Sequence, residues 1–534
     1  MHPLWPFTLG RFGAFLQGKG YLRKRFLGNA SNIQKQKMSK RKLITASMLY
    51  DLVVCPHRPT QDLFEDPARR DKVSPFIQLL WERGTCFEQE VMSSVREPVL
   101  DLSSFASDEK EQRTKAAMEQ RVPLIYGGRI HVNDLLGEPD LLRLEGVGYI
   151  PGDIKSGSGR EGGDEEDHRL KTRYAVQLAL YVDVLEQLRR SSGRRGFIWD
   201  IHHEEVAYDF MIPQGSRNPQ TLWEEYQNCL TQIRSILALK GGTRPAYGSV
   251  CKNCHWYSAC LKEVQATDDL TLIPELGRSR RESLLTHVRT VTELSKSDIG
   301  LFIQGKKTVF PSVGPPMLAK FYRRACLLRE PNPQPQLLEP IILPTAPIEL
   351  FFDIETDPLR DRCYLHGFIE RRDRENSSER FVAFFADTPT EEAEEQAFAD
   401  AWAYVQSVQP CVTYYYSKYE RTFWRKLRAR YPHVCTEIEL EAFFDPNRTI
   451  DLYNDIVKNK TDWPTLDYSI KTLAKYLGFK WRDSHPSGAA SIEWFYRWVE
   501  TKDSAVKQRI LEYNEDDCRA TRVLLDGLRR LKCD

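Results

Sequence analysis

Two apolar stretches of the chain carry acidic residues, and this limits the folds that the chain can adopt. One stretch ends in Asp153-Ile154-Lys155, and the other contains Phe352-Asp353-Ile354-Glu355. Buried Asp and Glu side chains are costly unless they are paired or bind a metal. We therefore expect both stretches to be strands that turn their acids toward a charged site, with apolar residues packed behind.

The overall composition excludes some classes of protein. At 534 residues the chain has room for roughly three domains. Its 76 Lys and Arg balance 75 Asp and Glu, so the net charge does not indicate a polyanion as partner. It has no run of 18 apolar residues, which excludes a membrane-spanning helix. Twelve cysteines at scattered spacings indicate a reducing compartment, so we expect a cytoplasmic protein.

The sequence divides into five parts. Residues 1–42 are basic and contain no Asp or Glu, which predicts a disordered, solvated tail, with contact to nucleic acid as the alternative. Residues 43–265 form a unit that opens with a helix and closes on a cysteine cluster. Residues 266–329 predict short helices, and residues 330–347, with six prolines, predict a linker. Residues 348–534 predict strands first and interleaved helices later, so the fold class is multidomain α/β with a mixed sheet.

The first acidic site is predicted at a hairpin. Asp140 follows a Gly-Glu-Pro turn and opens a strand over residues 141–144. In the next strand Asp153 and Lys155 are two apart and share a face, which Asp140 reaches from the neighbouring strand. Two carboxylates and the Ile154 carbonyl are suitable ligands for Mg²⁺ or Mn²⁺, and Lys155 can orient a water or stabilise charge on a phosphate. Asp-x-Lys alone also occurs in surface ion pairs.

Two further features accompany this site. Glu88 supplies an upstream acid on a predicted helix, and Gln177 and Tyr181 lie at i and i+4 of another predicted helix. The ordered set resembles the PD-(D/E)XK nucleases, specifically their RecB-like branch, and implies a restriction-endonuclease-like domain. The resemblance places these residues at the metal site: Glu88, Asp140, Asp153 and Lys155. Gln177 and Tyr181 would support substrate placement. CRISPR-associated relatives carry His at the position of Glu88.

A cysteine cluster closes the same domain. Cys251, Cys254 and Cys260 form a tight trio, and Cys55 near the start of the domain is the candidate for a fourth ligand. From spacing alone, zinc and an iron–sulfur cluster are both open. The RecB-like resemblance implies a structural [4Fe–4S] cluster that joins the two ends of the domain, with zinc as the alternative.

The segment from Leu270 to Leu294 resembles a helix-hairpin-helix, whose turn offers backbone N–H groups to a phosphate. Arg278, Arg280 and Arg281 follow this turn and can add positive charge. Glu275 stands where the motif usually has Gly. Simple packing of helices is the alternative to phosphate binding.

The second acidic site joins distant parts of the last domain. Asp353 and Glu355 share one face of a strand, and Tyr513 and Asp517 share one face of a long helix over residues 504–531. Between them, Glu420 lies where a strand ends and a helix starts.

This pattern resembles the DEDD exonucleases of the RNase H-like fold, and within them the YprB type. The resemblance implies four carboxylates around two Mg²⁺ ions. The metal ligands would be Asp353, Glu355, Glu420 and Asp517. Tyr513 would orient the attacking water. Glu420 is Asp in typical members, and an inert RNase H-like scaffold with residual acids is the alternative.

The order of the parts resembles a family of RecB-like nucleases with an appended RNase H-like exonuclease domain. We therefore predict a metal-dependent nuclease with two active sites that cuts DNA, at single-stranded ends or flaps, with RNA as an alternative substrate. DNA repair is a fitting role. No phosphate-binding Gly-rich motif of a motor is present, so unwinding would need a separate helicase. The competing hypothesis is a nucleic-acid-binding adaptor with one or both sites inactive, in DNA repair or mobile-element defence.

Overall fold

The protein is described by a computed structural model over residues 42–161, 169–215, 219–239, 242–358, 360–484 and 486–532. Residues Ile44–Asp534 group into one unit of the chain. The predicted basic tail, apart from Lys42, lies outside the described residues. None of the helices in the described ranges is both long and apolar enough to cross a membrane.

The first domain is organised around a mixed sheet with the strand order β11-β10-β7-β6-β3-β2. Its strands are β2 (Val99–Asp101), β3 (Leu124–Tyr126), β6 (Leu141–Glu145), β7 (Gly148–Ile154), β10 (Arg195–Trp199) and β11 (Glu205–Asp209). β6 and β7 form the predicted antiparallel hairpin, and β7 pairs in parallel with β10. The hairpin therefore occupies the centre of the sheet, where its apolar residues are covered on both faces.

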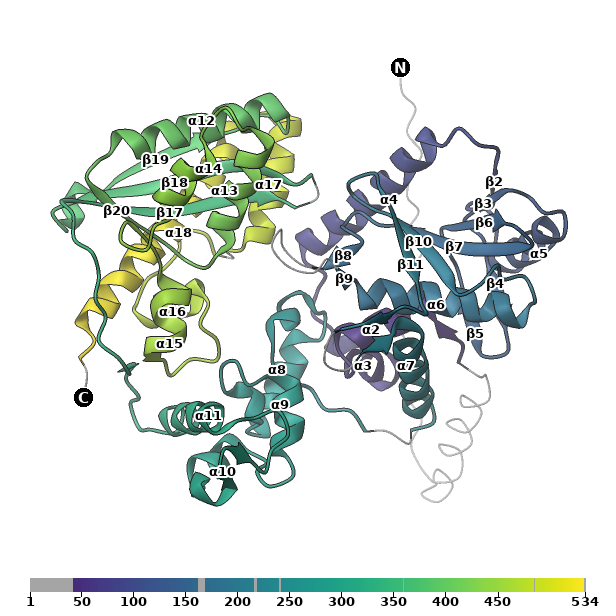
Figure 1. Cartoon of the computed structure of the whole chain (residues 1–534), viewed down its shortest axis with the longest axis horizontal. Coiled ribbons are helices and arrows are strands. Elements are labelled where there is room, and N and C mark those ends of the chain that lie inside the picture. The colour runs from purple at the N-terminus through teal and green to yellow at the C-terminus, as the bar shows by residue number, and fades with distance from the viewer. Residues whose placement is uncertain are drawn as a thin grey trace, which may run out of the picture. The chain divides into compact units, whose positions relative to one another are not determined.

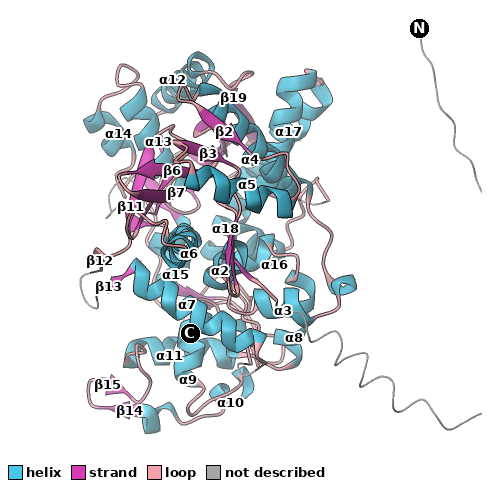
Figure 2. Ribbon diagram, turned by 90° about the vertical axis from the view of Figure 1, so that its right-hand side faces the viewer, coloured by secondary structure: helices cyan, strands magenta, loops and turns pink. Residues whose placement is uncertain are grey.

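The first domain has seven helices in the described ranges: α2 (Ala46–Val54), α3 (Arg58–Phe64), α4 (Pro75–Ser94), α5 (Ser107–Glu119), α6 (Thr172–Gln187), α7 (Leu222–Leu237) and α8 (Tyr257–Ala266). Helix α6 packs against β7 and β10, and α4 shares a second apolar core with the sheet. α2, α6 and α7 lie side by side and share one core with the inner sheet residues (Figures 1 and 2). The N-terminus of α7 is fixed by a capping box, in which Thr221 and Glu224 satisfy each other's backbone N–H groups.

Short elements complete the first domain. They are β1 (Ile44–Thr45), β4 (Ile130–Val132), β5 (Leu135–Gly137), β8 (Arg160–Glu161), β9 (Arg169–Leu170), β12 (Pro213–Gln214) and β13 (Gln220–Thr221), with the 3₁₀ turns η1 (Pro67–Arg69) and η2 (Ser249–Asn253). β1, β5 and β4 form a small sheet of their own. Because β5 leads into Asp140, this small sheet helps to fix where the first acidic site begins.

The helical segment has its own apolar core and differs in detail from the expected motif. Its elements are η3 (Leu270–Leu272), α9 (Gly277–Leu284), α10 (Val291–Ser295), η4 (Ile299–Phe302), β14 (Ile303–Gln304), β15 (Lys307–Thr308) and α11 (Pro315–Leu327). The first limb of the expected helix-hairpin-helix is a single 3₁₀ turn, η3. Leu276, Leu284 and Phe321 are buried in the shared core.

The arginines after the turn at Gly277 are engaged within the protein. Arg281 is 1% exposed and donates to Asp269 at 3.0 Å. Arg278 donates to the Arg244 carbonyl at 2.8 Å, and Arg280 donates to the Glu275 carbonyl at 2.7 Å. These contacts favour the packing alternative over the phosphate-binding one.

The proline-rich stretch predicted as a linker is largely irregular and includes one short strand. β16 (Gln336–Leu337) pairs with β22 (Thr461–Asp462) of the last domain. This pairing ties the linker to the domain that follows it.

The last domain contains a five-stranded mixed sheet in the order β19-β18-β17-β20-β21. The strands are β17 (Ile348–Asp357), β18 (Arg362–Arg372), β19 (Arg380–Phe385), β20 (Cys411–Tyr415) and β21 (Thr449–Asp451). The central strand β17 pairs antiparallel with β18 and in parallel with β20. The mixed sheet that the sequence predicts is therefore present.

Helices lie on both faces of this second sheet. They are α12 (Glu391–Ser407), α13 (Tyr419–Arg430), α14 (Glu437–Phe443), α15 (Lys458–Lys460), α16 (Ile470–Tyr476), α17 (Gly488–Thr501) and α18 (Ser504–Arg530), with the 3₁₀ turn η5 (Asn376–Ser378) and the π-helical turn η6 (Leu452–Val457). Helices α12, α13 and α14 lie on one side of this sheet and α18 on the other (Figure 1). Leu350, Phe352 and Ile354 of β17 pack with α12, α13 and α14, while Phe351 packs in the core that holds α18. The alternation of β17 therefore turns Asp353 and Glu355 toward α18.

Candidate active sites

The first acidic site lies at the β6–β7 hairpin. β6 begins directly after Asp140, and its first residue, Leu141, is opposite Gly152 of β7. Asp153 follows Gly152 and is 1% exposed. The register therefore brings the two acids together, and the Asp140 backbone N–H donates to Asp153 Oδ1 at 3.3 Å.

Lys155 completes a charged cluster with these two acids. Its Nζ lies 3.0 Å from Asp153 Oδ2 and 3.8 Å from Asp140 Oδ2. Burial raises the pKa of Asp140 to about 7, although Lys155 opposes the shift. Burial also acts to lower the pKa of Lys155, but the two carboxylates outweigh it and raise that pKa. Lys155 is therefore a protonated ammonium held against an acid pair.

Ile154 holds Asp140 through its backbone. The Ile154 N–H donates to Asp140 Oδ2 at 2.8 Å, which fixes the orientation of that carboxylate. The Ile154 side chain is buried in the core that includes Val91 of α4. The predicted use of its carbonyl as a metal ligand stays a prediction.

Glu88 approaches the pair from α4. Its carboxylate accepts a hydrogen bond from Tyr126 at 2.8 Å, and its charge contributes to the raised pKa of Asp140. Among the described residues, however, it does not form a group of three acids whose ligand atoms all lie within 4.8 Å. Glu88 is therefore a neighbour of the acid pair rather than part of a tight trio.

Tyr181 supports the turn that leads into Asp140. Its ring packs on Gly137, where an added Cβ would lie 2.7 Å from Tyr181 Cδ1, and its hydroxyl donates to the Glu138 carbonyl at 3.4 Å. Burial and the nearby Asp153 raise its pKa well above the ordinary value. Gln177 lies one turn earlier on α6 and is half-buried. A role of either residue in placing the substrate stays a prediction.

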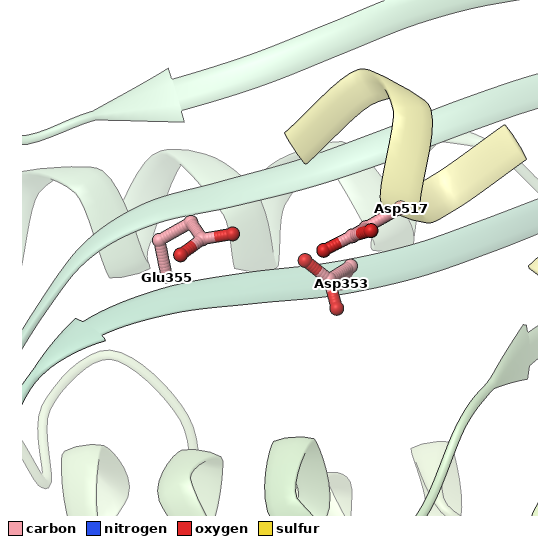
Figure 3. Close-up of side chains that lie close together, drawn as sticks. All are labelled: Asp353, Glu355 and Asp517. Carbon is pink, nitrogen blue, oxygen red and sulfur yellow. The ribbon is translucent and has the colours of Figure 1, made fainter. Parts of the chain in front are cut away.

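The second acidic site contains a tight group of three carboxylates. Asp353 and Glu355 project from β17, and Asp517 projects from α18 toward the same point (Figure 3). One carboxylate oxygen from each lies within 4.8 Å of the others. The structure thus brings together residues that are more than a hundred positions apart in the sequence, as predicted.

Neighbouring side chains hold these carboxylates in place. Asn514 donates from Nδ2 to Asp353 Oδ2 at 2.7 Å, and Trp481 donates from Nε1 to Asp517 Oδ1 at 2.7 Å. Both donors are buried.

Tyr513 lies beside Asp517 on the same face of α18. It is 3% exposed, and its hydroxyl accepts a hydrogen bond from Lys471 Nζ. Lys471 also lies 3.7 Å from Asp517 Oδ2. The neighbouring Asp516 points elsewhere, because Arg482 binds it at 3.0 Å.

Glu420 lies at the start of α13 and is 4% exposed. Its Oε2 atom is buried and has no hydrogen-bond partner. Its charge contributes to the raised pKa of Asp353, so it faces the trio, although it is not among the three closest acids. An unpartnered buried carboxylate oxygen fits a residue that donates to a cation.

The electrostatics of the trio also fit a cation. Burial first, and then the Asp517 carboxylate, raise the pKa of Asp353 well above its usual value and that of Glu355 to about 8. Like charges this close disfavour ionisation, and a divalent cation would remove that cost.

The four predicted cysteine ligands lie together. Cys55, Cys251, Cys254 and Cys260 all line one small cavity between the two ends of the first domain. Arg278 donates to Cys55 Sγ at 3.3 Å. The cysteines expected to be ordinary packed thiols include Cys229 and Cys411, which are buried elsewhere.

Sequence reasoning missed several residues of these sites. Asn514 precedes Asp517 by one helical turn, so its place on α18 was a usable signal. Trp481 and Tyr126 come from other elements, and only the tertiary fold brings them to the acids.

The comparisons with known proteins agree with this geometry. Residues 57–261 match the PD-(D/E)XK nuclease superfamily, and residues 350–529 match the RNase H superfamily. The chain combines a PD-(D/E)XK nuclease domain with an RNase H superfamily domain. A search of curated proteins gave no match. The acid pair of Asp140 and Asp153 lies in the PD-(D/E)XK domain, and the carboxylate trio lies in the RNase H superfamily domain. Nucleases of these superfamilies generally use divalent metals, which suits both clusters.

Proposed function

We propose that this protein is a metal-dependent nuclease with two active sites, which hydrolyses phosphodiester bonds of DNA at single-stranded ends or flaps. The observation that carries the proposal is the trio of Asp353, Glu355 and Asp517, whose oxygens converge within 4.8 Å in an RNase H superfamily domain. The acid pair with Lys155 in the PD-(D/E)XK domain supports a second, separate site.

In the RNase H superfamily domain, the metal ligands are assigned as Asp353, Glu355, Glu420 and Asp517. Mg²⁺ or Mn²⁺ bound there would activate a water and stabilise the leaving oxygen. Tyr513 orients the attacking water through its hydroxyl, which Lys471 holds in position. The resemblance to DEDD exonucleases makes removal of nucleotides from an end the mode of cutting.

In the PD-(D/E)XK domain, Asp140 and Asp153 are assigned as metal ligands, with the Ile154 carbonyl and Glu88 completing the oxygen donors. Lys155 stabilises the charge that develops on the phosphate, because its ammonium is already held beside both acids. Tyr181 keeps the turn before Asp140 in place, and Gln177 contacts the substrate from the same helix. A separate helicase would supply single-stranded substrate.

We also propose that the four cysteines hold a [4Fe–4S] cluster with a structural role. The proposal is supported by the four cysteines lining one small cavity, where a cluster would join the start and the end of the domain. Zinc, which also binds four thiolates, is the alternative.

The test is digestion of end-labelled single-stranded DNA, duplex DNA and RNA with Mn²⁺ or Mg²⁺. Wild type is compared with Lys155→Ala and Asp353→Ala, and Lys475→Ala, a lysine on α16 outside both acid clusters, is the matched control. We expect Lys155→Ala and Asp353→Ala to lose different activities, which would assign one substrate to each domain.

If wild type binds these nucleic acids but cuts none of them, the two-site nuclease is refuted. The adaptor hypothesis would then account for the chain. If both variants lose the same activity to the same extent, the two domains form one functional site rather than two.

A further inference from the structure

The structure contains a cavity of about 620 Å³ whose lining includes none of the residues assigned to either acidic site. Three parts of the chain line it. The loop that bears the late cysteines contributes Gly248 and Lys252, and the turn of the helical segment contributes Glu275. The remaining wall belongs to the RNase H superfamily domain and includes Tyr416, Ser417, Tyr453 and residues 466–470. None of the roles assigned so far uses this cavity.

Residues that line the cavity stand close in the sequence to residues of the acidic site. Ser417 precedes Glu420 by three residues, and its backbone N–H donates to Asp451 at 2.9 Å. On the other side, Ser469 is the N-cap of α16, the helix that carries Lys471. Because Lys471 contacts Tyr513 and lies 3.7 Å from Asp517, a ligand in the cavity would end close to the reacting centre.

Tyrosines dominate the wall on this side. The Tyr416 and Tyr453 ring centroids are 5.5 Å apart, and both side chains are half-buried. The Tyr416 hydroxyl donates to the Tyr468 carbonyl, which fixes the ring. Aromatic rings held in this way are the platforms on which proteins stack the bases of single-stranded nucleic acid.

The acids that line the cavity are neutralised by their neighbours. Glu275 is paired with Lys320 at 2.6 Å and Arg324 at 3.0 Å. Asp467 accepts a hydrogen bond from Tyr247 at 2.8 Å and lies 3.8 Å from Lys252. The side chain of Lys252 is 52% exposed, so it is available to a phosphate.

We propose that this cavity binds the end of a single nucleic-acid strand and delivers it to the carboxylate trio. The inference rests on the proposed nuclease function and adds the site that binds the unpaired strand, whose bases stack on Tyr416 and Tyr453. The volume suits one or two nucleotides, since pockets for small ligands span about 300–1,000 Å³. Two of the three walls of the cavity lie outside the residues that match the RNase H superfamily. The cysteine-bearing loop and the helical segment therefore help to form the cavity.

The experiment uses the full-length protein with Ca²⁺ in place of Mg²⁺, so that binding is measured without cleavage. A fluorescently labelled oligothymidylate is titrated with wild type, Tyr453→Ala and Tyr453→Phe. Tyr476→Ala is the matched control, because Tyr476 is a 37% exposed tyrosine of the same domain that does not line the cavity. Thermal unfolding of each variant checks that it is folded.

We expect Tyr453→Ala to raise the Kd roughly tenfold or more, since stacking of one base contributes that much to binding. Tyr453→Phe keeps the ring and should bind as wild type does, and Tyr476→Ala should as well. The same titration with oligouridylate shows whether RNA shares the cavity.

A second measurement separates this inference from the proposed function. Hydrolysis of the p-nitrophenyl ester of thymidine monophosphate tests the carboxylate trio without a long strand. The ratio of kcat/KM for the oligonucleotide to kcat/KM for the ester should fall in Tyr453→Ala. If Tyr453→Ala changes neither the Kd nor this ratio, the cavity does not bind the strand. Hydrolysis of the ester by wild type would in that case still support the nuclease function. If wild type does not hydrolyse the ester, the result counts against the proposed nuclease function. The comparison of Kd values would still show whether the cavity binds the strand.

Discussion

Gly367 is the position where one added methyl group tests the second acidic site. It lies on β18 directly opposite Asp353 of β17. A Cβ at Gly367 would overlap Asn514 Oδ1, well inside the 3.0 Å that real Cβ atoms keep from their neighbours. Asn514 is fully buried, and its other amide atom holds Asp353. Gly367→Ala must therefore displace Asn514 from Asp353.

Two known effects set the size of the expected loss. Overpacking of a dense core costs about 1–3 kcal/mol of stability. Loss of a hydrogen-bonding partner behind a metal ligand lowers metal affinity or activity by roughly 10–100-fold. We expect Gly367→Ala to lower the hydrolysis assigned to the RNase H superfamily domain by that factor and to raise the Mg²⁺ concentration for half-maximal activity. Hydrolysis that depends on Lys155 should not change.

A double-mutant cycle tests the cause. Asn514→Ala removes the side chain that the new methyl group would strike, so the two substitutions should not be additive. The double variant should be no less active than Asn514→Ala, and only the nearby Phe381 ring, at 3.1 Å from the added Cβ, leaves a residual cost. Activity is measured against Mg²⁺ concentration, and stability by urea unfolding. If Gly367→Ala keeps wild-type Mg²⁺ dependence, or if the two losses simply add, the reasoning is wrong.

Three further predictions concern stability and the cysteine site. Desolvation lowers the pKa of buried His366 to about 3. As the pH falls, the unfolded chain therefore takes up a proton on this histidine before the folded protein does. The unfolding free energy should consequently fall by about 1.4 kcal/mol per pH unit below the ordinary His pKa. His366→Gln, which can still accept from Trp424, should remove this component in urea titrations at several pH values. Asp462→Ala breaks a fully buried ion pair with Arg324 and should destabilise the protein by about 3–5 kcal/mol in thermal unfolding. Arg323 also pairs with Asp462, but its side chain is 39% exposed, so Arg323→Ala should cost less than about 1 kcal/mol. Cys254→Ala should lose the iron and the brown colour of anaerobically purified protein, and Cys229→Ala should keep both; equal iron contents would refute the cluster.

The elements with a strong local pattern could be predicted from the sequence. The apolar runs of the last domain became β17, β18 and β19, and the spacing of Tyr513 and Asp517 placed both on one face of α18. The hairpin of Asp140 and Asp153 followed from its turn residues in the same way. In each case, the period of a single strand or helix decides which side chains share a face.

What the sequence could not supply depends on contacts between elements. Trp481 binds Asp517 only because the loop before α17 folds over α18, and no local pattern marks it. The first limb of the expected helix-hairpin-helix forms only a 3₁₀ turn, η3, and its arginines are used for packing. Glu420 faces the trio without joining its tight group, a distinction that spacing in the sequence cannot make.

Strand β17 also carries a buried acid, Glu349, with which Asp353 and Glu355 can be compared. Glu349, near the start of the strand, is 2% exposed, and Arg371 and Arg529 neutralise it from both sides. On the same strand Glu355 is also buried and Asp353 is half-buried, yet Lys471, the cationic side chain that acts on both, is shared with Tyr513 and Asp517. Their pKa values are raised for this reason, first by burial and then by Asp517. The same strand shows that the fold can pair a buried acid with arginine where charge must be balanced internally. The three acids of the trio lie together without such arginine partners among the described residues. This arrangement favours a site in which a bound divalent ion supplies the positive charge.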